Sequence, residues 1–271
     1  MEYSKPPVVE TVLSVQFKPL PDFGAGQLGA YWKGLGPEWP HVVDAPSVEP
    51  VFEQFDGRNV WAPAAFVKLS SKIDLRLQIR NHPKDRMIQV QNGRFFYNWL
   101  GAPGIEYPSY ESVRPEFDDQ WKRFREFVIA NTKENVVRPN QWEILYVNHL
   151  PRGSVWNDLS DLPQALTFLR HPDFSGTSLI PDGLFGEWRF EIPPEKGRLY
   201  VKLRMKKPED KEGDLQCVVL TLTARGHIGE VSPTLNEGLA LGHATIRESF
   251  DRLTSTEAHK YWGVQYANSR S

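Results

Sequence analysis

Alternation of apolar and polar positions predicts a series of β-strands along this chain. Residues 8–17 are rich in β-branched side chains and alternate from Glu10 onward, as a strand with one buried face does. Asn92-Gly93, between two apolar runs, is typical of a tight hairpin turn. Further strands are predicted at residues 47–55 (toward a sheet edge, because of Pro50), 73–79, 87–91, 94–99, 142–150, 187–192, 199–205 and 216–223. Together these segments predict an antiparallel sheet.

A different spacing, of three and four residues, predicts two long helices. The first begins near Ser112, a suitable N-cap, and has Pro115 in its first turn, where backbone N–H groups have no partner anyway. Shorter helices are predicted at residues 23–35, at 161–169 with Ser160 as the cap, and at 256–262. The apolar stripes of the long helices are Val113, Phe117, Trp121, Phe124 and Val128, and then Leu235, Leu239, Gly242, Ile246, Phe250 and Leu253.

The order of these elements occurs twice. Residues 1–135 and residues 136–271 each read as a strand, a helix, further strands and a long helix, although the two halves share no residue-level identity. We therefore expect an α+β fold with an N-terminal lobe (1–135) and a C-terminal lobe (136–271) in one compact unit. Each lobe would hold an antiparallel sheet packed on a long helix, a duplicated helix-grip arrangement similar to TATA-box-binding-protein-like folds. Such a likeness of fold implies no function.

Charge and composition exclude several classes of protein. The 271 residues include 32 Lys and Arg against 34 Asp and Glu, with 16 basic and 17 acidic residues in each half, so neither half is a basic nucleic-acid-binding module. Aromatic residues make up 12% of the chain, which is unlike a disordered protein. The single cysteine, Cys217, excludes a disulfide scaffold and is expected to be buried and inert. The first seven residues do not resemble a signal peptide, and no apolar run is long enough for a membrane span, so we expect a cytoplasmic protein without membrane association.

Four short segments, which span nearly the whole chain, resemble a sporadically distributed, largely uncharacterised prokaryotic protein family of similar length. The resemblance implies no established activity. The patchy distribution of that family suggests carriage in mobile or defence-related gene clusters. The segments are Pro7–Val12 with Val15–Phe17, Gln89–Gln91 with Arg94-Phe95 and Asn98-Trp99, Tyr146–Asn148, and His243 with Phe250 and Trp262-Gly263.

Motifs for catalysis or cofactor binding are weak. Gly24, Gly26 and Gly29 match the G-x-G-x-x-G spacing of dinucleotide sites, but the tight strand-to-helix turn and parallel strands of such sites are missing, and Glu53 as a ribose-binding acid agrees only by chance. The histidines lack the spacing of four residues that one helix face needs to hold a metal ion. We expect no metal and no cofactor. The simplest interpretation of His243 is a structural one, in which it is a hydrogen-bonded residue between helix and sheet.

Two strand faces carry polar side chains that suit binding or solvation better than metal catalysis. Asp74, Arg76, Gln78 and Arg80 alternate on one strand, and Gln89 and Gln91 share their face. Lys202, Arg204 and Lys206 alternate on another, and Arg94 precedes three aromatic residues. Basic and aromatic residues together are used by RNA-binding sheets, although the aromatic residues here are expected to fill the core.

The leading prediction is a non-enzymatic binding protein that engages a protein partner, such as a toxin or effector of a mobile or defence gene cluster, through a sheet face or an inter-lobe groove. The alternative is a nucleotide or RNA sensor with a cleft between the lobes. The third class is an enzyme that uses His243 or His149. The candidate ligand- or partner-binding residues are Arg76, Arg80, Gln89, Asn98, Asn148 and His243.

Overall fold

One nine-stranded antiparallel sheet organises the fold. The computed structural model describes residues 1–55, 75–102, 105–170, 176–180, 182–206, 216–229 and 233–265. The strand order is β3-β4-β5-β6-β2-β7-β10-β9-β8, and a separate two-stranded sheet pairs β1 (Glu2–Tyr3) with β11 (Val264–Gln265). The strands of the large sheet are β2 Val8–Phe17, β3 His41–Pro46, β4 Leu75–Arg80, β5 Arg86–Gln91, β6 Arg94–Leu100, β7 Pro139–Pro151, β8 Phe185–Ile192, β9 Gly197–Lys206 and β10 Cys217–His227. The predicted α+β class and antiparallel sheet are confirmed.

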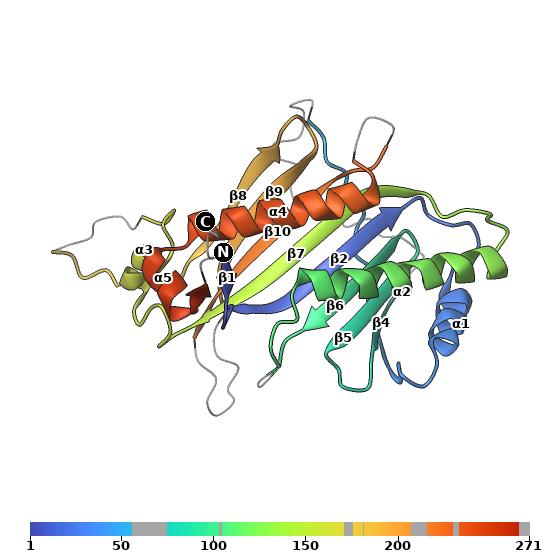
Figure 1. Ribbon diagram of the computed structural model, residues 1–271, viewed down its shortest axis with the longest axis horizontal. Helices are drawn as coiled ribbons and strands as arrows, with labels where there is room; N and C mark the ends of the chain where they lie inside the picture. Colours follow the sequence, from blue (N-terminus) through green and yellow to red (C-terminus); the bar gives the residue numbers. More distant parts are fainter. Residues whose placement is uncertain are drawn as a thin grey trace, which may run out of the picture.

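Both long helices lie on the same face of the sheet (Figure 1). Helix α2 (Tyr110–Asn131) crosses the strands of the first half, and α4 (Leu235–Leu253) crosses those of the second half. Helix α1 (Ala25–Leu35) packs beside α2, while α3 (Leu162–Ala165), its preceding 3-10 turn (Leu159–Asp161) and α5 (Thr256–Tyr261) lie at the opposite end of the sheet. We call the side of the sheet that carries α2 and α4 the helix face, and the reverse side the polar face.

The two halves of the chain meet within the sheet. Strand β2 pairs antiparallel with β7 along almost its full length, with Leu13 opposite Ile144. Residues 1–135 thus contribute β3, β4, β5, β6 and β2 to the sheet, and residues 136–271 contribute β7, β10, β9 and β8. The core is continuous across this seam because side chains from both halves fill the space between the sheet and the two helices.

Aromatic rings and small residues fill that space in different ways under the two helices. Under α2, the ring centres of Phe95 and Phe17 lie 5.3 Å and 5.6 Å from that of Phe124 on the helix. Under α4 the sheet comes closer, because a Cβ on Gly238 would lie 2.3 Å from the ring of Trp142. Glycine at this position therefore sets the distance between α4 and β7.

The segment predicted as a strand at residues 47–55 is not a strand, and that prediction was wrong. The strand of this region is β3, which ends at Pro46. The segment after it crosses the polar face instead of pairing along an edge, because side-chain amides of the sheet take the place of a neighbouring strand. The backbone N–H of Val48 donates to Gln91, that of Val51 to Gln16, and that of Glu53 to Gln141. We call residues 47–55 the crossing segment.

Two helix boundaries also differ from the prediction. Helix α2 begins at Tyr110, so Ser109 rather than Ser112 precedes it and Pro115 lies inside the helix instead of in its first turn. The 161–169 helix is shorter than predicted, and its cap is not Ser160. The carboxylate of Asp161 accepts the N–H groups of Asn157 and Asp158 at its start, and an isolated bridge from Leu166 to Thr254 ends it. Residues 73–74, the start of the strand predicted at 73–79, lie outside the described residues.

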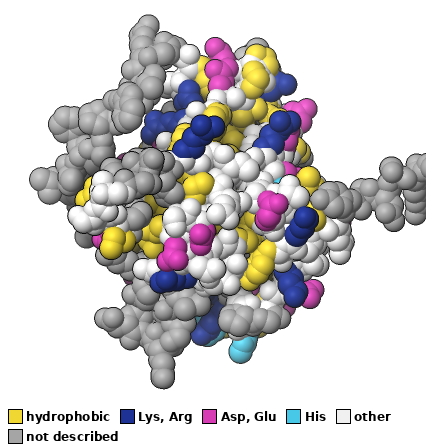
Figure 2. Space-filling view, turned by 90° about the vertical axis from the view of Figure 1, so that its left-hand side faces the viewer, with side chains coloured by type: hydrophobic (Ala, Val, Ile, Leu, Met, Phe, Trp, Pro, Cys, Tyr) yellow, Lys and Arg dark blue, Asp and Glu magenta, His cyan; other side chains and the backbone are white. Residues whose placement is uncertain are grey.

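The surface of the protein agrees with its near-neutral charge. On the face seen in Figure 2, basic and acidic side chains are interspersed among uncharged ones. Within the described ranges, no helix has the length and apolarity needed to cross a membrane.

Candidate functional site

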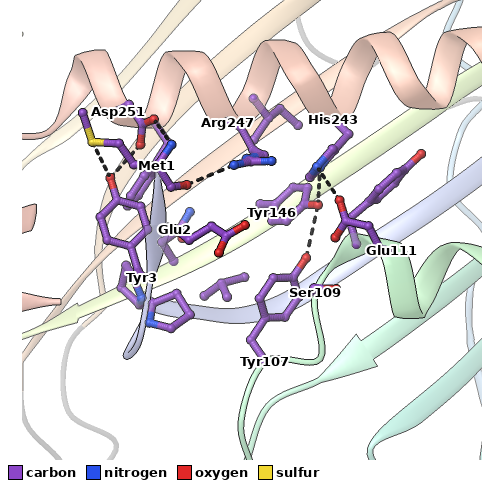
Figure 3. Close-up of a pocket in the computed structure, with 17 residues that line it drawn as sticks. Met1, Glu2, Tyr3, Tyr107, Ser109, Glu111, Tyr146, His243, Arg247 and Asp251 are labelled. Atoms are coloured by element: carbon purple, nitrogen blue, oxygen red, sulfur yellow. Dashed lines mark hydrogen bonds and ion pairs between the residues drawn. The ribbon is translucent and has the colours of Figure 1, made fainter. Parts of the chain in front are cut away.

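A pocket of about 260 Å³ lies on the helix face, between α4 and the start of α2 (Figure 3). Strand β7 forms its floor, and β1 with the residues that follow it forms one side. We call it the inter-helix pocket. Its lining residues are Met1, Glu2, Tyr3, Pro6, Pro7, Val8, Tyr107, Ser109, Tyr110, Glu111, Tyr146, Asn148, His243, Ile246, Arg247, Phe250 and Asp251.

The position of His243 follows from the packing of α4. Gly242 faces β7 so closely that a Cβ there would lie 2.5 Å from Ile144. The next residue, His243, is therefore held over Tyr146, two positions along the strand on the same face. Ile246 and Phe250, at helical spacing from His243, continue the pocket wall. One side of the pocket is thus an extension of the apolar stripe of α4.

A chain of three hydrogen-bonding side chains ends at His243. The hydroxyl of Tyr107 donates to the oxygen of Tyr146 at 3.3 Å, and the Tyr146 oxygen lies 2.8 Å from Nδ1 of His243. Because Tyr146 accepts from Tyr107, its own proton is available for Nδ1 of His243. The proton of the neutral imidazole then resides on Nε2, which is buried and lies 4.0 Å from a carboxylate oxygen of Glu111.

The surroundings of the imidazole keep it neutral. Tyr110 stacks on the ring of His243, with 4.0 Å between the ring centres and 7° between the planes. Burial, reinforced by the nearby charge of Arg247, lowers the pKa of His243 to about 4, although Glu111 opposes the shift. Burial also raises the pKa of Tyr107 to about 12 and that of Tyr146 well above its ordinary value. All three groups of the chain are therefore uncharged near neutral pH.

Glu111 remains ionised at the rim of the pocket. Its own backbone N–H at the start of α2 lowers the pKa of the carboxyl group, and Ser109, His243 and Arg247 add to this effect against the cost of partial burial. The side chain is 71% exposed. The pocket thus has an uncharged aromatic interior and a charged carboxylate at its opening.

The first residues of the chain close the pocket on the other side. The hydroxyl of Tyr3 donates to Asp251 at 2.6 Å, and Arg247 donates to the backbone oxygen of Met1 at 3.0 Å. Tyr3 also contacts the ring of Phe250 edge-on at 5.8 Å. These contacts hold β1 against α4, and Figure 3 shows the side chain of Glu2 between this wall and the tyrosines.

Acidification is expected to destabilise the protein through His243. Its folded-state pKa of about 4 lies below the ordinary value of 6.5, so the unfolded chain binds the proton first and the contribution of the neutral ring is lost as the pH falls from about 6.5 toward about 4. In urea unfolding, the stability difference between the native chain and His243→Gln should shrink by about 1–2 kcal/mol from pH 7 to pH 5. A difference that stays constant over this range would contradict the assignment.

The structure separates the six predicted site residues into two groups. His243 and Asn148 both line the inter-helix pocket. The other four, Arg76, Arg80, Gln89 and Asn98, lie across the sheet on the polar face, where Arg76 donates to Gln89, Gln89 to Asn98, and Asn98 to Glu10. Arg80 lies exposed at the end of β4. Asp74 lies outside the described residues. No single cleft therefore contains all six.

The side chains of His149 and of the alternating basic residues Lys202, Arg204 and Lys206 of β9 also lie on the polar face. Burial, together with Lys206 and Arg204 of β9, lowers the pKa of His149. Gly24, Gly26 and Gly29 lie at the start of helix α1. All strand pairs of the described nine-stranded sheet are antiparallel, so it lacks the parallel strands of a dinucleotide site.

Glu53 has a structural role that the sequence did not indicate. It is buried on the polar face, where its carboxylate accepts from Arg198 at 2.7 Å, from Arg225 at 2.5 Å and from Tyr200 at 2.8 Å. The crossing segment carries it over β7 to β10 and β9. No spacing in the sequence indicated these partners, because they lie about 145 to 172 residues away.

The sequence also did not single out most of the pocket. Tyr107 precedes α2, Glu111 lies in the first turn of that helix, and Glu2 lies in the two-residue strand β1. Their one signal was the clustering of tyrosine, proline and serine at residues 107–110, just before the long helix.

Among the described residues, no three His, Cys, Asp or Glu side chains are grouped as a metal site requires. No family model, curated protein or solved structure matches the chain.

Proposed function

We propose that this chain is a non-enzymatic binding protein that engages a protein partner, and that the inter-helix pocket receives an anchoring side chain of that partner. The observation that carries the proposal is the pocket itself, about 260 Å³ in volume, lined by four tyrosines and one phenylalanine and open at the helix face. Partner interfaces concentrate their binding energy in buried anchor side chains that fill such pockets. Tyrosine suits this purpose, since it offers a large contact area and one polar atom.

The state of His243 favours binding over catalysis. A general base must reach its substrate through a nitrogen that lacks a proton. In this pocket Nδ1 accepts from Tyr146, Nε2 is buried, and the ring of Tyr110 stacks on the imidazole. The tyrosine protons are held by raised pKa values. The arrangement therefore suits a rigid binding surface whose internal hydrogen bonds are already formed before a partner binds.

We also propose that residues 1–135 and 136–271 are two copies of one helix-grip unit. The sheet order supports this: β2, β6, β5 and β4 run outward from the seam in one half, and β7, β10, β9 and β8 do so in the other. Each series is followed by a long helix on the same face. The pocket then lies where the two helices approach the seam, which is the junction of the two lobes.

A variant that fills the pocket tests the proposed function. Glu2→Trp places a large ring at the pocket wall, whereas Glu257→Trp places the same ring on the exposed surface of α5. The products of neighbouring genes are the first partners to screen, and affinity for the partner is measured by titration calorimetry. We expect Glu257→Trp to bind as the native chain does, and Glu2→Trp to bind about a hundredfold more weakly. Equal affinity of the two variants, or the lack of any stoichiometric partner in the native host, would refute the proposal.

A further inference from the structure

The charges around the inter-helix pocket sum to a net negative charge. Three carboxylates line it, those of Glu2, Glu111 and Asp251, against the guanidinium of Arg247 and the N-terminal ammonium group of Met1. His243 adds no positive charge near neutral pH because its pKa is lowered to about 4 by burial. A pocket with this balance attracts cations and repels anions.

Three of the five charged groups are already engaged by the protein itself. Asp251 accepts from the hydroxyl of Tyr3 at 2.6 Å and from the ammonium group of Met1 at 3.2 Å, and Arg247 donates to the backbone oxygen of Met1 at 3.0 Å. All three therefore stabilise the wall formed by β1. The carboxylate of Glu2 makes no hydrogen bond or ion pair with the part of the chain that the structure describes. Glu111 accepts from its own backbone N–H and from Ser109, approaches His243 only to 4.0 Å, and has a side chain that is 71% exposed. Glu2 and Glu111 are therefore the carboxylates that a ligand can still reach.

Between these acids lie the rings of the tyrosines. Tyr107 and Tyr146 line the pocket from below in Figure 3, and Glu2 and Glu111 lie on different sides of it. Aromatic rings attract a cation at their faces, and the attraction grows when water is excluded. A flat guanidinium group can also stack on a ring while it donates hydrogen bonds in its plane to carboxylates.

We infer that the inter-helix pocket takes a basic side chain, arginine or lysine, that the protein partner presents. The cationic group lies against the tyrosine rings and pairs with Glu2 and Glu111. This inference rests on the proposed function, since it names the chemistry of the anchor that enters the pocket. An acidic or purely aliphatic anchor would leave the two carboxylates without a partner when the interface excludes water, which is costly.

Capped amino acids test the inference without knowledge of the partner. The probes are N-acetyl-arginine amide and N-acetyl-lysine amide, with the neutral N-acetyl-citrulline amide as the isostere of the arginine probe. Their dissociation constants are measured on the intact protein by NMR titration. We expect the two cationic probes to bind at millimolar concentrations, with shifts at residues of the pocket, and the citrulline probe to bind at least about tenfold more weakly.

Matched variants separate this inference from the proposed function. The double variant Glu2→Gln, Glu111→Gln removes both carboxylates with little change of shape, and Glu126→Gln, Glu257→Gln removes two exposed carboxylates of α2 and α5. We expect the first pair to weaken the arginine probe at least about tenfold and the second pair to leave it unchanged. Equal binding of arginine and citrulline probes, or equal affinity of the two double variants, overturns the cationic anchor. If Glu2→Trp nevertheless abolishes partner binding, the proposed function stands without it.

Discussion

Replacement of Glu53 by glutamine is expected to lower the free energy of unfolding by about 3 kcal/mol. The carboxylate is buried, and it holds Arg198, Arg225 and Tyr200 at 2.5 to 2.8 Å. Loss of one partner of a buried ion pair leaves the other charge in a poorly solvated place, and this costs more than the pair contributes. Glutamine keeps the shape but offers a single oxygen to three donors. Chemical denaturation followed by tryptophan fluorescence measures the effect.

Glu187→Gln is the matched control for this prediction. Glu187 also pairs with two cations, Arg189 at 2.9 Å and Lys202 at 3.1 Å, but both partners are about half exposed. Water can replace the lost carboxylate there, so the expected cost is below about 1 kcal/mol. Similar small losses in both variants would mean that the crossing segment contributes little to the fold.

Gly238→Ala is expected to destabilise the protein by about 3 kcal/mol, because a methyl group at this position has no room. Its Cβ would lie 2.3 to 2.5 Å from three ring atoms of Trp142, a side chain that is completely buried under α4. Relief requires either displacement of the helix from β7 or rotation of the indole ring. Since α4 also carries His243, we expect the hydrogen bond to Tyr146 to lengthen in the variant.

The same substitution elsewhere supplies the control. Gly29 lies in α1 with open space around its Cβ position, so Gly29→Ala should stabilise the protein by about 0.5–1 kcal/mol through helix propensity alone. Thermal unfolding of both variants measures the two effects. A neutral or stabilising Gly238→Ala would show that the close approach of α4 to β7 is not required.

The elements that depend on local pattern were predictable. The stripes from Val113 to Val128 and from Leu239 to Phe250 are buried as the helical spacing requires, and Asn92-Gly93 forms the turn between β5 and β6, with Gly93 at a φ of 91°. Both patterns follow from backbone geometry, so a single sequence is enough to see them. Strand β3 was missed and the crossing segment was misassigned, since their surroundings come from residues far along the chain.

The candidate site was predictable only in part, for the same reason. His243 and Asn148 were singled out, but the sequence grouped them with Arg76, Gln89 and Asn98, which the structure places on the other face of the sheet. The side-chain period of a strand assigns residues to two faces, but it does not say which face of one strand continues the face of another.

The sequence by itself therefore determined the α+β class, the two long amphipathic helices, most strands and the even division of charge between the halves. Periodicity and composition depend on residues that are close together in the chain, so one sequence is enough to read them. Only the tertiary structure decided that both helices share one face, that Glu53 crosses to Arg225, and that Glu2, Glu111 and His243 surround one pocket. Those relations join residues far apart in the chain, such as Glu53 and Arg225, which are 172 positions apart, and only packing of the whole chain can bring them together.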